Sequence, residues 1–311
     1  MLARARLPAS GLHTKSVRRA PQVSVMVADA TRLVQDAQNR HKSAPTATAA
    51  LGRALCGALL MGCFRKDDEV VQLNFNGRGP LGQLTAIADT YGRARGYVQN
   101  PSADPPLRPD GKLDVGTAVG AGVLSVVRTH PRMKEPYTGV VPIHSGEVAE
   151  DLAVYLADSE QMQAAVGVGV LLDRQAQVTS AGGFLVSVLP SADDFVIAAL
   201  ETNLSQMRSV SELLAEGKTP EDIARIIAGG MDVQLLGDVE PTYGPCEEDD
   251  LRQRMRRAVA TLGERQVREI IAEQGFLEVT CEFCKTSYRM AEDEIEEILV
   301  LSSEFDSSAA P

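Results

Sequence analysis

The chain has few aromatic residues and no segment of concentrated positive charge. Trp is absent, and Phe, Trp and Tyr together make up 4% of the 311 residues. Nucleic-acid bases stack on aromatic side chains and their phosphates bind Lys and Arg, whereas this chain has a net charge of -11. The composition therefore argues against a nucleic-acid partner.

The glycine-rich strings lack the residues that hold nucleotide phosphates. GTAVGAG (116–122) and GVG (167–169) contain no Gly-Lys-Ser/Thr and do not match GxGxxG. Ser145 follows His144, but no GxSxG turn surrounds it. We therefore predict no ATP hydrolysis and no enzymatic activity.

The amino terminus lacks acidic residues and the long apolar segment of a secretory signal. Residues 1–20 contain no Asp or Glu, and their basic residues are Arg4, Arg6, Lys15, Arg18 and Arg19. This composition is typical of transit peptides. We predict that residues 1–21 are a transit peptide or a disordered segment. The chain is then expected in a chloroplast or mitochondrion, with a cytoplasmic location as the alternative.

The chain also lacks a convincing membrane span. Its most hydrophobic stretch, residues 44–64, contains Arg53 and is dominated by small residues. A charge near the middle of a span is costly, so this stretch predicts a buried core helix and no membrane association.

The hydrophobic pattern predicts an α+β protein whose body, residues 22–195, mixes helices and strands. A strand at 23–27 precedes helices at about 31–40 and 45–63. Alternating runs separated by Gly-Pro, Asn-Pro and Pro-Pro then predict strands between 70 and 128. Further strands are expected at 166–172 and 183–189, with a helix at about 147–159 between the two groups of strands.

Past Pro190 the pattern becomes helical, and no further strand is expected before the C-terminal unit. Residues 196–240 predict a helical connector. Its last helix has a well-marked beginning, with Thr219 as N-cap, Pro220 in the first turn and Asp222 as the reciprocal cap. Gly229 and Gly230 end it.

Residues 241–301 predict a small C-terminal unit, followed by a disordered tail at 302–311. Two helices precede the string FLEVTCEFCKTSYRM, which predicts a strand, a tight turn and a strand. An acidic helix is expected at 292–297.

The chain has five cysteines, an odd number without the dense spacing of a secreted disulfide scaffold. Cys281-x-x-Cys284 could bind zinc or form a local disulfide. Cys246 is a third candidate zinc ligand, and Glu247, Glu248 or water could supply a fourth. We predict one zinc ion per chain, with an unmetallated dithiol as the alternative. Cys56 and Cys63 are expected to be buried packing residues.

Several strings together resemble a known family in order and spacing, over residues 22–300. They are SAPTATAALGRAL (43–55), GPLG (79–82), GYVQNP (96–101), GKLDVGTAVG (111–120), KEPYTGVVP (134–142), SGEVAEDL (145–152), AGGFLV (181–186) and VTCEFC (279–284). They resemble the redox-regulated 33-kilodalton heat-shock chaperone family.

That resemblance implies a dimeric chaperone that holds unfolded client proteins under oxidative stress and needs no ATP. The family uses four cysteines, as CxC and CxxC, to hold zinc. In the family, oxidation forms disulfides, releases the zinc, unfolds the zinc-binding unit and destabilises the connector. Here Gly244 stands where the family has the first cysteine, ahead of Cys246. The region before the strand at 23–27 also departs from the family, so its first strand is expected to be missing or rebuilt.

For client binding we predict the apolar face of the connector. Its residues are Leu204, Met207, Leu213, Leu214, Ile223, Ile226 and Ile227. Because Gly244 removes a thiol, a chaperone that is active without oxidant is one alternative. A CxxC dithiol oxidoreductase and a zinc-containing interaction protein without holding activity are two others.

Overall fold

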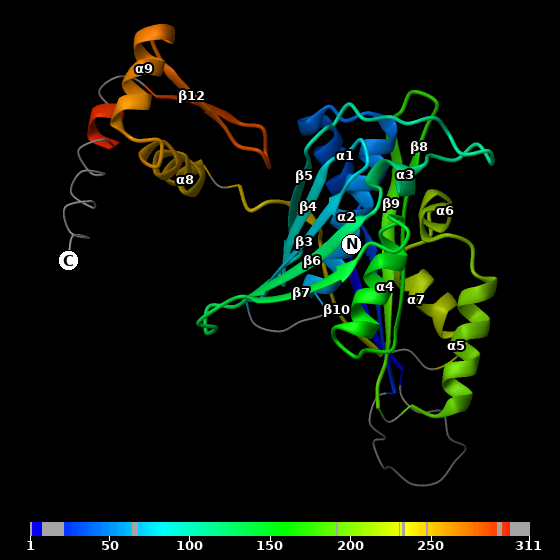
Figure 1. Cartoon of the computed structure of the whole chain (residues 1–311). Coiled ribbons are helices and arrows are strands. Elements are labelled where there is room, and N and C mark those ends of the chain that lie inside the picture. Colours follow the sequence, from blue (N-terminus) through cyan, green and yellow to red (C-terminus); the bar gives the residue numbers. More distant parts are fainter. Residues whose placement is uncertain are drawn as a thin grey trace. The chain divides into compact units, whose positions relative to one another are not determined.

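The computed structural model of the chain contains two compact units, Met1–Tyr243 and Gly244–Pro311, here called the body and the C-terminal unit (Figure 1). The structure describes residues 2–7, 22–63, 68–190, 192–229, 231, 234–246, 248–290 and 294–298. Both units combine helices and strands. The predicted α+β class is therefore confirmed.

The body contains a five-stranded sheet in the order β10-β1-β2-β9-β8. Its strands are β1 (Leu2–Leu7), β2 (Val23–Asp29), β8 (Ala164–Leu172), β9 (Val178–Val188) and β10 (Gln234–Val239). Neighbouring strands are antiparallel. β2 is buried on both faces, since Val23, Val25 and Val27 enter one apolar cluster and Met26 and Ala28 enter another.

A second, six-stranded sheet has the order β11-β5-β4-β3-β6-β7. Its strands are β3 (Val70–Gly77), β4 (Gln83–Asp89), β5 (Arg93–Val98), β6 (Gly122–Thr129), β7 (Tyr137–Pro142) and β11 (Thr242–Tyr243). These include the strands predicted between residues 70 and 128. β11 pairs with β5 in parallel, so the last residues of the body are attached to this sheet.

Helix α2 (Pro45–Cys63) contacts strands of both sheets. All of its residues except Pro45 and Arg53 are buried. The small residues are needed there, because a Cβ at Gly52 would lie 2.6 Å from a methyl group of Val34. The helix is long and apolar enough to cross a membrane, but 94% of its most apolar window is buried inside the protein. The predicted core helix is confirmed.

The remaining helices of the body lie around the sheets (Figure 1). They are α1 (Thr31–His41), α3 (Val115–Val119), α4 (Ala149–Asp158), α5 (Asp194–Gln206), α6 (Val210–Ala215) and α7 (Pro220–Ala228). Helices α5, α6 and α7 form the predicted helical connector. They pack against the face of β2 that carries Val23, Val25 and Val27.

The predicted caps of α7 are confirmed. The Thr219 hydroxyl accepts the Asp222 N–H at 3.2 Å, and an Asp222 carboxylate oxygen accepts the Thr219 N–H at 2.9 Å. Gly229 ends the helix with φ of 57°, a backbone conformation that favours glycine. These local signals define the helix without help from its packing.

Two strand predictions were wrong. Residues 2–7 form β1, although the sequence analysis placed them in a targeting or disordered segment, and β10 lies in residues 196–240, which were predicted to be a helical connector. β1 pairs with both β2 and β10. β1 and β10 are short and come from opposite ends of the body, so neither has a local signal that reveals its partner. Residues 8–21 lie outside the described part of the chain.

The C-terminal unit contains α8 (Glu248–Ala260), α9 (Glu264–Gln274), β12 (Leu277–Thr280) and β13 (Ser287–Met290). β12 and β13 form an antiparallel hairpin, as predicted. Residues 294–298 are helical, whereas Glu292 and the tail at 302–311 lie outside the described residues. The small apolar core consists of Val259, Val267, Leu277, Met290, Ile295 and Ile298.

Candidate functional site

Cys281 and Cys284 lie in the turn of the β12–β13 hairpin. The backbone N–H of Cys281 donates to the Thr286 carbonyl at 3.0 Å, and the Cys281 carbonyl accepts the Lys285 N–H at 2.9 Å. Both thiols are buried, with exposed fractions of 5% and 4%. The hairpin thus fixes the two sulfur atoms on a strand turn, not at the beginning of a helix.

The side chain of Cys246 lies within hydrogen-bonding distance of Cys284. Burial raises the pKa of the Cys284 thiol, but hydrogen bonds from Thr286 and from the side chains of Cys281 and Cys246 lower it below its ordinary value overall. All three cysteines are reduced. The structure therefore brings together the three cysteines that the sequence analysis proposed as ligands.

The donor atoms suit zinc, because thiolates are preferred ligands of structural Zn²⁺. Within the part of the chain that the structure describes, however, no group of three or more His, Cys, Asp or Glu side chains is arranged to hold a metal ion. Glu247 and the side chain of Glu248 lie outside the described residues. The thiols fit zinc in type but fall short of a complete tetrahedral set.

Gly244 has a backbone conformation that other residues avoid. Its φ is 149°, and a Cβ added there would lie 3.3 Å from the Cys246 nitrogen and near no other atom. There is space for a side chain at this position, but the backbone favours glycine. A cysteine at this position would be strained.

The predicted client-binding residues are mostly buried or half-buried in contacts within the body. Leu213, Ile223 and Ile227 are buried, and Ile226 is 38% exposed. The half-buried residues are Leu204, Met207 and Leu214. Their partners on the sheet are Val23, Val25, Val27 and Val186. The connector and the sheet thus bury each other's apolar surfaces.

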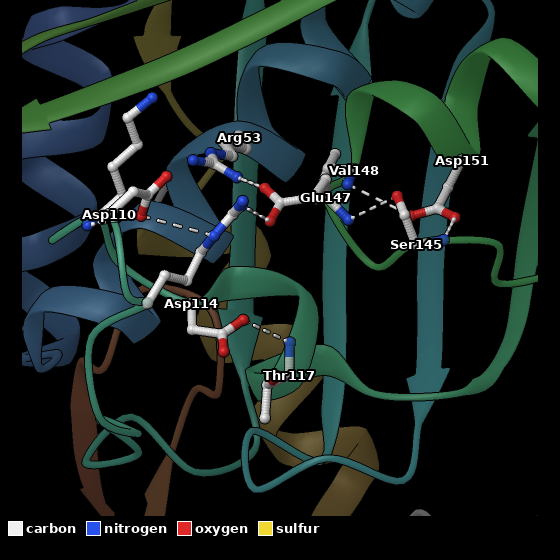
Figure 2. Close-up of polar contacts among 10 residues, drawn as sticks. Arg53, Asp110, Asp114, Thr117, Ser145, Glu147, Val148 and Asp151 are labelled. Atoms are coloured by element: carbon white, nitrogen blue, oxygen red, sulfur yellow. Dashed lines mark hydrogen bonds and ion pairs between the residues drawn. The ribbon is translucent and has the colours of Figure 1, made fainter.

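An ion pair joins two of the family-like strings, SAPTATAALGRAL and SGEVAEDL (Figure 2). Glu147, from SGEVAEDL, forms an ion pair with Arg53 of α2 and a second one with Arg108 at 3.3 Å. Asp114, from GKLDVGTAVG, caps α3 by accepting the Thr117 N–H at 3.0 Å. The sequence analysis quoted these strings but assigned their charged residues no role.

Asp151 holds the turn before α4 (Figure 2). Its buried carboxylate accepts the backbone N–H of His144 at 2.6 Å, of Ser145 at 3.0 Å and of Val148 at 3.3 Å. Val148 has φ of 65° and ψ of −56°, and the Ala149 N–H donates to the Glu147 carbonyl at 2.7 Å. This is a strained γ-turn, which costs about 1–3 kcal/mol. Asp151 stabilises the turn and so positions Glu147.

Replacing Asp151 by Ala is expected to lower the free energy of unfolding by about 3 kcal/mol, because three backbone donors lose a charged acceptor. Asp158→Ala, at the exposed other end of α4, is the matched control, with an expected change within about 0.5 kcal/mol. Urea unfolding followed by circular dichroism measures both, since the chain has no Trp. Equal losses in the two variants would contradict this role of Asp151.

Comparisons with known proteins agree with this architecture. The family described as "Hsp33 protein" matches residues 14–291. The "33 kDa chaperonin" of Geobacter sulfurreducens is 40% identical over 91% of this chain and 92% of its own length. That of Desulforamulus reducens is 39% identical over 91% of this chain and 95% of its own length.

A solved structure shows the same fold. The crystal structure of the 33 kDa chaperonin from Thermotoga maritima matches with a TM-score of 0.83 and 32% identity, over 97% of this chain and 99% of that one. The names of these relatives support a chaperone function, so the class of protein is a molecular chaperone. The chain belongs to the Hsp33 family.

Proposed function

We propose that this chain is a holding chaperone that binds unfolding proteins without ATP and without enzymatic turnover. The proposal rests on the apolar surface that is buried between the connector helices and β2. Ile223 and Ile227 on one side and Val25 and Val27 on the other are each 0% exposed. Separation of the two faces creates a contiguous apolar surface, which suits varied unfolded clients because the hydrophobic effect is non-directional.

Oxidation of the C-terminal unit is the proposed trigger for this separation. Peroxide takes two electrons from Cys281 and Cys284, which form a disulfide while the peroxide is reduced to two water molecules. The new bond replaces the hydrogen bond between the two thiols. Cys246 loses its partner in the same step, so the small unit is destabilised.

Zinc is the proposed cofactor, with Cys246, Cys281 and Cys284 as its ligands and water or an acidic side chain as the fourth. When bound, zinc would supply part of the folding free energy of the C-terminal unit. Since Gly244 contributes no ligand, we expect weaker zinc binding than four cysteines would give. With weaker zinc binding, the reduced protein would keep some holding activity.

We also propose that unfolded client proteins are the partners, that the active form is a homodimer, and that the protein works in a chloroplast or mitochondrion. The basic, acid-free residues 1–20 support the location. Size-exclusion chromatography with light scattering, before and after oxidation, tests the homodimer.

The test is to measure zinc content and suppression of client aggregation on the same samples, reduced and then treated with peroxide. We expect about one zinc per chain in the reduced protein, lost as holding activity rises. Gly244→Cys should bind zinc more tightly, but by less than a full extra ligand would give, because of the strained φ. Gly244→Ser, with the same strain and no thiol, is its control.

Two other outcomes would change the conclusion. Zinc-free reduced protein that already holds clients would identify a constitutive chaperone. No suppression of aggregation in either state, together with dithiol exchange activity, would reject the chaperone proposal in favour of an oxidoreductase.

A further inference from the structure

The amino-terminal strand β1 lies inside the five-stranded sheet, between β2 and β10. Residues Leu2–Leu7 pair with Val23–Ala28 on one side and with β10 on the other. β10 is the edge strand, and its ladder in the described structure runs along β1 alone. Without β1, β10 would lose the ladder that holds it in the described structure, and a strand without a ladder is not stable by itself.

Along the chain, β10 lies between the connector helices and the C-terminal unit. It follows α7, the last connector helix, and precedes β11 and the C-terminal unit. Helix α7 lies against both β1 and β2, and its Ile223 and Ile227 are buried in the cluster that includes Val25 and Val27 of β2. β1 therefore supports two consecutive elements, the last helix of the connector and the strand that follows it.

We propose that β1 is an autoinhibitory latch, which holds β10 and α7 on the sheet and keeps the client-binding surface covered. Loss of β1 removes the ladder of β10 and part of the support of α7. It thereby uncovers the apolar face of β2 without any change at the cysteines. This inference rests on the proposed holding function.

Two features of the sequence bear on this latch, the transit peptide predicted at residues 1–21 and Gly244 in place of a cysteine. Removal of residues 1–21 after import would remove β1 and activate the chaperone irreversibly. Such activation needs no oxidant, and a chain with Gly244 in place of a zinc-binding cysteine has less control through its thiols. Oxidation would then control the exposed surface only in chains that retain residues 1–21.

The test uses full-length variants of Ala5, which is paired with Val25 and Leu235. Ala5→Pro removes a backbone donor from a strand that has neighbours on both sides. Ala5→Val favours the strand and is the matched control, and Ala5→Gly is a milder change that remains usable if the proline variant does not fold. All are studied in reductant, by hydrogen exchange with mass spectrometry and by client aggregation.

We expect amide exchange in residues 220–239 to be roughly 10- to 100-fold faster in Ala5→Pro than in the parent, with exchange in α2 unchanged. Holding activity in reductant should be lowest in Ala5→Val, higher in the parent protein, higher again in Ala5→Gly and highest in Ala5→Pro. Unchanged exchange in residues 220–239, or an equal increase throughout α2, would overturn the latch. Faster exchange in 220–239 with no holding activity, in the variant or in the oxidised parent, would keep the latch and reject the holding function.

Discussion

The variant Ile227→Ala is expected to hold unfolded clients in reductant, where the proposed function gives the parent protein little holding activity. Ile227 is 0% exposed and belongs to the cluster that joins α7 to β2. Truncation of a buried Ile to Ala costs about 2–5 kcal/mol. Because the cost falls on the contact between α7 and β2, it shifts the local release of the connector by roughly 30- to 5000-fold. Light scattering from a chemically unfolded client, diluted into reduced protein, measures the gain.

Ile226→Ala is the matched control, since Ile226 is the neighbouring residue of the same type but is 38% exposed. It should leave the connector packed and the reduced protein inactive, while slightly weakening capture after oxidation. If Ile227→Ala loosened α7 in hydrogen exchange and yet captured no client, the connector and β2 would not form the client-binding surface.

The second large effect concerns Cys56, which we expect to be inert to oxidants and alkylating reagents in the folded protein. Burial raises the pKa of its thiol to about 12, and the nearby Asp29 carboxylate adds to the increase. At neutral pH its thiolate fraction is then roughly 1000-fold lower than at an ordinary cysteine. Oxidation should therefore spare Cys56 and favour the C-terminal unit, where the pKa of Cys284 is lowered.

Mass spectrometry of alkylated protein at pH 7 tests this difference, with urea-unfolded protein as the control in which Cys56 reacts fully. The neutral thiol of Cys56 is favoured by folding, so its contribution to stability is present below the ordinary pKa of 9.0 and is lost as the pH rises toward 12. Rapid modification of Cys56 in the reduced native protein would mean that α2 opens far more readily than its burial suggests.

The elements predicted correctly are those with local signals. Helix α7 has its N-cap at Thr219 and its end at Gly229, and α2 is identified by its small residues. The β12–β13 hairpin has the alternation and tight turn that its sequence predicts. Each signal lies within the element itself, so one sequence is enough to find it.

The residues of the candidate site also differ in how far the sequence reveals them. Cys281 and Cys284 are recognisable as a pair from their spacing, and Cys246 only by elimination and resemblance. The role of Asp151 could have been suspected from its position three residues after the N-cap, Val148. The Arg53–Glu147 ion pair has no such signal, because its partners lie on α2 and before α4.

The sequence by itself determined the helices with caps, the core helix, the hairpin with its two cysteines and the family to which the chain belongs. Only the tertiary structure decided that residues 2–7 are a sheet strand, that β10 pairs with them, and that Ile223 and Ile227 are covered while Ile226 is exposed. The physical reason is that caps and turns are satisfied by neighbours in the chain. Strand partners and buried faces depend on contacts between distant segments, which form only when the whole body is assembled.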